Sequence, residues 1–175
     1  MIRILVVDDE KIERDGILFL LRKRNIDLDI LEAANGQDAL AILEKEPVDI
    51  LLTDIRMPFL DGLDLSFRAR QLLPDLVVII FSAYGEFDYA KRAIDSHVQH
   101  YLLKPIDPEE FYAVVQQALD RCKTLREARL QDQRLREVVR KGMAYEKESL
   151  LFDLFNGAAV GPDLLDDLRR TGVSL

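Results

Sequence analysis

The chain has 175 residues, with 24 Lys and Arg against 32 Asp and Glu and a net charge of −8 at pH 7; this length suits one ordinary domain with an appendage, and the acidic balance argues against a nucleic-acid surface over the whole chain. Cys122 is the only cysteine, which excludes an intramolecular disulfide. No apolar run approaches the roughly 20 residues that span a bilayer, and no signal-peptide pattern begins the chain, so we expect a cytoplasmic protein without a membrane partner.

Five short apolar runs rich in β-branched residues predict five strands, and the spacing of apolar residues between them predicts helices. In chain order the expected strands are residues 2–7, 28–32, 50–54, 76–82 and 100–103. The expected helices are residues 10–24, 36–45, 63–73 and 87–96, followed by a longer helix that begins at Pro108. In the first helix we expect Ile12, Ile17, Leu20 and Leu21 to face the core.

Strands that alternate with helices are typical of an α/β domain, here a doubly wound five-stranded parallel sheet. Right-handed crossovers place helices on both faces of such a sheet. Ligands bind beyond the carboxyl ends of its strands, where the strand order reverses. The residues that follow the strands are therefore the first candidates for a functional site.

Polar side chains end four of the five predicted strands. Asp8 and Asp9 follow the first strand, Asp54 ends the third, Ser82 ends the fourth and Lys104 follows the fifth. Because parallel strands point the same way, these ends meet along one edge of the sheet. We therefore expect three carboxylates, a hydroxyl and an ammonium to form one cluster.

This cluster holds the groups that phosphoryl transfer needs. Neighbouring carboxylates repel one another unless a cation lies among them, and oxygen ligands favour Mg²⁺, which makes Asp8, Asp9 and Asp54 a candidate cage. A carboxylate such as Asp54 can attack phosphorus to form an aspartyl-phosphate. The Lys104 ammonium would neutralise charge, and the Ser82 hydroxyl would donate to a phosphoryl oxygen.

Five motifs within residues 1 to about 120 resemble those of the receiver domain of two-component response regulators. They are V-V-D-D-E-x-x-x-R at residues 6–14, D-I-R-M-P at 54–58, D-G at 61–62, S-A-Y at 82–84 and Y-L-L-K-P at 101–105. The resemblance implies a flavodoxin-like receiver fold with strand order 2-1-3-4-5. It also implies a sensor histidine kinase as partner, and a signalling switch that catalyses its own phosphotransfer and slow dephosphorylation.

The same resemblance implies roles at the carboxylates. Asp54 would be the phosphoacceptor. Asp9 and Asp54 would bind Mg²⁺ directly, with the backbone carbonyl of Arg56 as a third protein ligand, and Asp8 would act through water.

Further implied roles concern the last two strands. Ser82 and Lys104 would contact the phosphoryl group, and Tyr101 would be the aromatic switch residue that turns inward when Ser82 is drawn to the phosphate. The Lys104–Pro105 peptide bond would be cis. One departure is His97, which stands where receivers commonly carry a glycine.

The C-terminal part of the sequence has a different character. No helix breaker follows Pro108 before Gly142, and between Arg121 and Lys141 there are eight Lys and Arg against three Asp and Glu. Such an excess is most often a solvated helix surface. Beyond Gly142 we expect two further helices, residues 146–155 and 163–170, with a turn between them.

We expect residues 1–121 to form the receiver domain and residues 122–175 a helical linker or dimerisation segment. Leu125, Leu135 and Val139 would have no receiver surface to cover, so a homodimer, or contact with the 146–155 helix, would bury them. The run K-E-S-L-L-F-D-L-F-N-G at residues 147–157 resembles the linker of AraC-type (YesN-like) transcriptional regulators. That resemblance implies DNA as a partner, through an output domain beyond Leu175.

Two other functions stay open at this point. The chain could be a stand-alone receiver whose tail only dimerises. It could also be a phosphatase with an aspartate nucleophile, which uses the same residue types. Such enzymes carry D-x-D-x-[TV] after the nucleophile strand, whereas the first strand here ends in Asp8-Asp9-Glu10.

Overall fold

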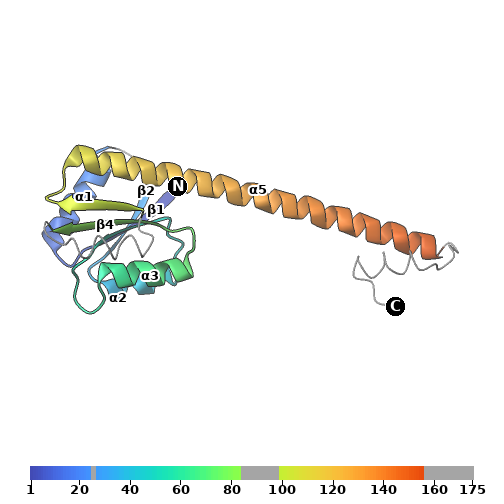
Figure 1. The fold of residues 1–175 in the computed structure, drawn as a ribbon, viewed down its shortest axis with the longest axis horizontal. Helices are drawn as coiled ribbons and strands as arrows, with labels where there is room; N and C mark the ends of the chain where they lie inside the picture. Colours follow the sequence, from blue (N-terminus) through green and yellow to red (C-terminus); the bar gives the residue numbers. More distant parts are fainter. Residues whose placement is uncertain (25–26, 84–98, 156–175) are drawn as a thin grey trace. The chain divides into compact units, whose positions relative to one another are not determined.

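The computed structural model describes residues 1–24, 27–83 and 99–155 (Figure 1). The chain divides into two compact units, Met1–Leu125 and Arg126–Leu175. The helix predicted over residues 87–96, His97, Tyr84 of the S-A-Y motif, and the turn and helix predicted over residues 156–170 lie outside the described residues.

The first unit is built on a five-stranded parallel sheet. Its strands are β1 (Ile2–Val7), β2 (Leu28–Ala33), β3 (Ile50–Asp54), β4 (Val77–Ala83) and β5 (His100–Lys104). They lie in the order β2-β1-β3-β4-β5, and each neighbouring pair is parallel. The predicted fold class and strand order are therefore confirmed.

Four helices are described: α1 (Lys11–Lys23), α2 (Gly36–Leu43), α3 (Gly62–Leu72) and α5 (Pro108–Phe155). Side chains cap three of them, because the carboxamide of Asn35 and the carboxylates of Asp61 and Asp107 accept hydrogen bonds from backbone N–H groups of the first turn. Helices α2 and α3 cover one face of the sheet, and α1 and the first turns of α5 cover the other (Figure 1).

Helix α5 passes through Gly142 and ends at Phe155, so the prediction of a separate helix over residues 146–155 is wrong. One glycine in a helix costs only about 1 kcal/mol relative to alanine, and strong helix formers surround this one. Ion pairs one turn apart, Asp132–Arg136 and Glu137–Lys141, both at 2.8 Å, also support the helix.

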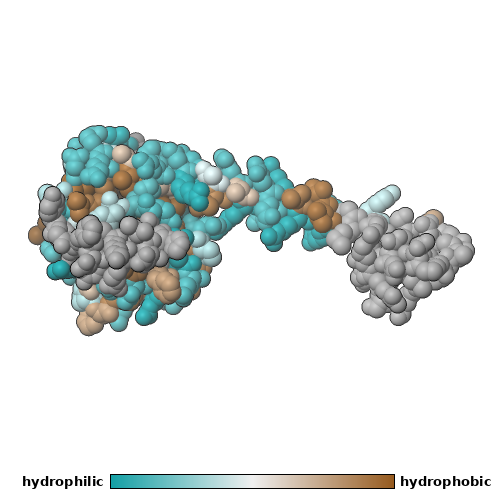
Figure 2. Space-filling model, in the orientation of Figure 1, coloured by the Kyte–Doolittle hydropathy of each residue, from teal (hydrophilic) through white to brown (hydrophobic). Residues whose placement is uncertain are grey.

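Apolar side chains on the second unit's part of α5 are exposed. Leu130, Leu135, Val138 and Val139 are each more than half exposed, and Figure 2 shows an apolar patch on this otherwise mostly polar stretch of helix. Residues 146–155 belong to the same helix and therefore cannot fold back over Leu135 and Val139. Among the described residues, no helix combines the length and the apolar character that crossing a membrane requires.

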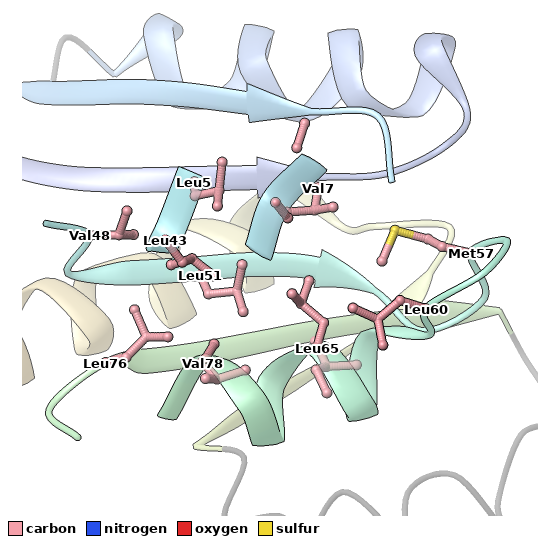
Figure 3. Packing of buried hydrophobic residues seen from close by; sticks show 14 of the residues in the cluster. Leu5, Val7, Leu43, Val48, Leu51, Met57, Leu60, Leu65, Leu76 and Val78 are labelled. Atoms are coloured by element: carbon pink, nitrogen blue, oxygen red, sulfur yellow. The ribbon is translucent and has the colours of Figure 1, made fainter. Parts of the chain in front are cut away.

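Two apolar clusters, one on each face of the sheet, form the core of the first unit. On the α2 and α3 face, Leu5, Leu51 and Val78 of the strands pack with Leu43 of α2 and Leu65 of α3 (Figure 3). The opposite cluster consists of the alternate strand residues together with side chains of α1 and α5. Successive residues of a strand point to opposite faces, so the strands are buried on both sides.

The buried face of α1 differs from the predicted one. Ile17, Leu18 and Leu21 are buried, Leu20 is only partly buried, and Ile12 is 85% exposed. The spacing from Ile12 to Ile17 is not a three-, four- or seven-residue step, and this places Ile12 on the other side of the helix.

The first unit extends to Leu125 because the core does. Phe111, Val115 and Cys122 of α5 are buried in the cluster on that face, and Leu125 packs against it. Cys122 thus acts as a small apolar residue of the core. The expectation that Leu125 lacks a receiver surface is wrong.

Phe59, in the loop between β3 and α3, generates a prediction about stability. Its φ of 71° lies in the left-handed region, where a bulky side chain is strained, and its side chain is 87% exposed. Asparagine tolerates this conformation, so Phe59→Asn should raise the free energy of unfolding by up to about 1 kcal/mol in urea denaturation. Phe67→Asn is the matched control, because it removes an exposed phenylalanine from α3 without relieving such strain. Equal effects of the two changes would contradict the explanation.

Candidate functional site

The carboxyl ends of three strands bring two carboxylates and one ammonium together. Lys104 Nζ at the end of β5 lies 3.2 Å from Asp8 Oδ2 and 3.2 Å from Asp54 Oδ1. All three side chains lie on the face of the sheet that α1 and α5 cover. Asp8, for example, follows Ile4 and Val6 at two-residue steps, and both of those residues face that side. The order β2-β1-β3-β4-β5 thus joins residues almost a hundred positions apart.

Both carboxylates are removed from water. Asp8 is fully buried and Asp54 is 7% exposed. Asp8 Oδ1 also accepts a hydrogen bond of 2.8 Å from the backbone N–H of Glu10, and Arg14 Nη1 donates to the Asp8 carbonyl at 2.7 Å. The Lys104 ammonium in turn lies 5.3 Å from the centroid of the Phe81 ring.

Burial controls the protonation of these groups. Burial raises the pKa of Asp54 to about 6, although the Lys104 ammonium opposes the shift. Burial likewise raises the pKa of Asp8, against the opposing effects of the Glu10 N–H and Lys104. Burial alone would lower the pKa of Lys104, but a hydrogen bond to Glu13 and the charges of Asp54 and Asp8 outweigh it and raise that pKa. Lys104 therefore stays positively charged beside two carboxylates whose ionised forms are disfavoured by burial.

Gly62 explains why an Asp-Gly pair follows the loop after β3. A Cβ atom at Gly62 would lie 1.9 Å from the carbonyl oxygen of Asp54, which leaves no room for a side chain. The Gly62 N–H donates to the Ile55 carbonyl at 2.9 Å. The loop therefore turns directly against the backbone that carries Asp54.

The structure places the other predicted residues as follows. Asp9 and the side chain of Arg56 are exposed. Ser82 is fully buried near the end of β4, in phase with the strand residues that face α2 and α3. Tyr101 is half-buried and packs against that same cluster. The Lys104–Pro105 bond is cis, as the resemblance implies.

A divalent cation fits the chemistry of this edge. Its donors would be the carboxylates of Asp8, Asp9 and Asp54 and the backbone carbonyl of Arg56, all hard oxygen ligands. In the part of the chain that the structure describes, no three acidic, histidine or cysteine side chains form a ready metal cage. Mg²⁺ needs only one or two carboxylates, with water and phosphate oxygens as its other ligands.

Sequence reasoning missed two residues of the site. Glu13 Oε2 is a third carboxylate partner of Lys104 Nζ, and Arg14 holds the backbone of Asp8. Both lie in the first turn of α1. The available signal was the short connection, because a helix that begins directly after a strand end must place its first turn beside that end.

Comparisons with known proteins identify relatives of this chain. The family model of the response regulator receiver domain matches residues 4–116. The chain is 34% identical over 125 residues to the uncharacterized transcriptional regulatory protein YesN of Bacillus subtilis, and 34% identical over 116 residues to the transcriptional regulatory protein HptR of Staphylococcus aureus. It covers 34% and 45% of those two proteins, against 70% and 66% of its own length.

Solved structures show the same fold. The crystal structure of a two component transcriptional regulator AraC from Clostridium phytofermentans has a TM-score of 0.66 and 38% identity, over 71% of this chain and 97% of that one. The receiver domain of AraT, a response regulator from Geobacillus stearothermophilus, has a TM-score of 0.63 and 35% identity, over 73% and 97%.

The raised pKa of Asp54 predicts how stability depends on pH. The folded state holds this proton more tightly than the unfolded chain, so the unfolding free energy should fall as pH rises from about 3.8 through about 6. A shift of that size corresponds to roughly 3 kcal/mol. In metal-free buffer at pH 8, Asp54→Asn should therefore raise the unfolding free energy by up to about 3 kcal/mol, since the net shift already includes the opposing attraction of Lys104. The gain should shrink towards pH 4.

The matched control for this measurement is Asp9→Asn, which removes an exposed carboxylate from the same edge. Urea titrations of the two variants between pH 4 and pH 8 give the comparison. A gain for Asp54→Asn that is the same at both pH values would contradict the assigned cause.

Proposed function

The chain belongs to the response regulator receiver family, and we propose that Asp54 accepts a phosphoryl group from a sensor histidine kinase and thereby switches a DNA-binding output. The single observation that carries the proposal is the burial of Asp54 beside the Lys104 ammonium at 3.2 Å. This carboxylate is poised at a strand end, with a fixed positive charge beside it.

In the proposed reaction an Asp54 oxygen attacks the phosphorus of a phosphohistidine. The new O–P bond forms as the P–N bond breaks, and the imidazole leaves with the bonding electrons. Phosphoryl transfer depends mainly on position and on neutralised charge. Lys104 supplies a cation that stays charged, and the raised pKa of Asp54 still leaves its carboxylate ionised near neutral pH.

Mg²⁺ is part of this proposal. Asp8, Asp9 and Asp54, with the Arg56 carbonyl, would hold the ion, which would neutralise charge on the phosphoryl oxygens. The support is electrostatic, because Asp8 and Asp54 already share one ammonium, and phosphorylation replaces the single charge of the Asp54 carboxylate with about two negative charges on the phosphoryl group. The single positive charge of Lys104 cannot neutralise the charges of Asp8 and of the phosphoryl group together.

We place the switch at Ser82 and Tyr101. Both side chains face the α2 and α3 side of the sheet, on neighbouring strands. Ser82 is buried near the end of β4, and Tyr101 is half-buried and packs against the cluster on that face. Movement of Ser82 towards a phosphoryl group would free space for the tyrosine.

The output of the switch is proposed from the relatives. YesN and HptR are transcriptional regulatory proteins, and the chain spans between a third and a half of their length. A DNA-binding domain and a cytoplasmic location fit that role. Exposed Leu135, Val138 and Val139 on α5 also support a homodimer, because apolar area left in water costs roughly 25 cal/mol per Å².

The phosphoacceptor is tested with a small donor such as acetyl phosphate. With Mg²⁺, the intact mass of the chain should rise by one phosphoryl group, and Asp54→Asn should abolish the rise. EDTA should abolish it as well. Asp64→Asn, an exposed carboxylate of α3, is the control that should still be phosphorylated. A mass increase that persists in Asp54→Asn or in EDTA would refute the assignment.

The homodimer is tested by sedimentation of the whole chain. We expect a dimer, and we expect the double variant Leu135→Gln, Val139→Gln to be monomeric because it removes the apolar contact from α5. Phe67→Gln with Leu72→Gln removes two exposed apolar side chains from α3 and should leave the dimer intact. If the unchanged chain sediments as a monomer, this part of the proposal is wrong.

A further inference from the structure

The Lys104 ammonium has a third carboxylate partner that lies outside the strand ends. Glu13 Oε2 is the nearest of its three carboxylate contacts, while Asp8 and Asp54 each lie at 3.2 Å. The Glu13 side chain is 37% exposed, whereas the other two carboxylates are buried. One of the three carboxylate partners of the site's lysine therefore comes from a helix and not from a strand end.

Glu13 is held in place by the packing of α1. It lies in the first turn of that helix, which Ile17, Leu18 and Leu21 anchor to the sheet. The helix backbone that carries Glu13 is therefore anchored independently of the strand ends. Glu13 and Lys104 also line an open groove of about 370 Å³ beside α1.

We propose that Glu13 is a positioning residue that restrains Lys104 and so weakens the site's hold on a phosphoryl group. This inference rests on the proposed function of Asp54. A phosphoryl group on Asp54 would attract the ammonium away from α1, and the contact with Glu13 would have to loosen for Lys104 to follow. The Glu13 charge also repels an incoming phosphoryl dianion. Both effects lower the affinity of the site for a phosphoryl group.

The test uses the whole chain and the non-covalent phosphoryl mimic beryllofluoride with Mg²⁺. Glu13→Gln keeps the size of the side chain and removes its charge. Its dissociation constant for beryllofluoride should fall by about two- to fivefold, the range expected for a partly exposed ion pair. Glu13→Asp keeps the charge on a shorter side chain and should lie between Glu13→Gln and the unchanged chain.

The matched control is Asp15→Asn. Asp15 is an exposed acid on the same helix, paired with Lys11 at 2.7 Å and not with Lys104. This variant changes the net charge by the same amount, so its affinity should stay near that of the unchanged chain. Equal affinities of Glu13→Gln and Asp15→Asn, or weaker binding by Glu13→Gln, would overturn the proposal.

A second measurement needs neither metal nor phosphoryl mimic. In metal-free protein, the NMR signals of the Lys104 side chain should shift in Glu13→Gln and stay unchanged in Asp15→Asn. Unmoved signals in Glu13→Gln would overturn the contact itself. If beryllofluoride binds none of the variants while the Lys104 signals shift as expected, the proposed function fails and the ion pair stands.

Discussion

The site depends on one ammonium placed between buried carboxylates. Without Lys104, the charges of Asp8 and Asp54 would lie close together, out of water and with no cation, which is an arrangement that folded proteins avoid. In the strand register Asp54 is level with Leu102, so Lys104 lies two residues further along β5 and reaches both carboxylates from there. The fold can therefore bury the charges of Asp8 and Asp54 only with this strand arrangement, and with the loop after β3 that Gly62 makes possible.

The residues of the proposed switch lie on both faces of the sheet. The charged groups of Asp8, Asp54 and Lys104 continue the face that α1 and α5 cover, and Ser82 and Tyr101 continue the face of α2 and α3. Such a division is a direct result of the two-residue period of a strand. In the proposed switch, the charged groups and the residues that respond to them would therefore lie on opposite faces of the sheet.

Much of this arrangement follows from pattern alone. Buried strands show as apolar runs, and the rule that parallel strands end at one edge brings Asp8, Asp54 and Lys104 together before any coordinates are known. The order of the strands came from the resemblance, because periodicity says nothing about which strands are neighbours. Pattern also says nothing about which of two adjacent carboxylates turns inward, and here Asp8 is buried while Asp9 is exposed.

The features that sequence reasoning missed have one cause in common. They depend on where a residue lies around a helix and on the helix propensity of its neighbours, and not on residue type. Ile12 is apolar yet lies on the solvent side of α1, while Glu13, next to it, is polar yet reaches the site. Gly142 is a weak breaker within strong helix formers, so α5 continues through it. As a result, one helix contains both Phe111, in the core beneath β5, and the exposed apolar patch at Val138 and Val139. The hydrogen bonds of a helix continue through a single glycine, so the breaker signal at Gly142 does not mark a boundary between two helices.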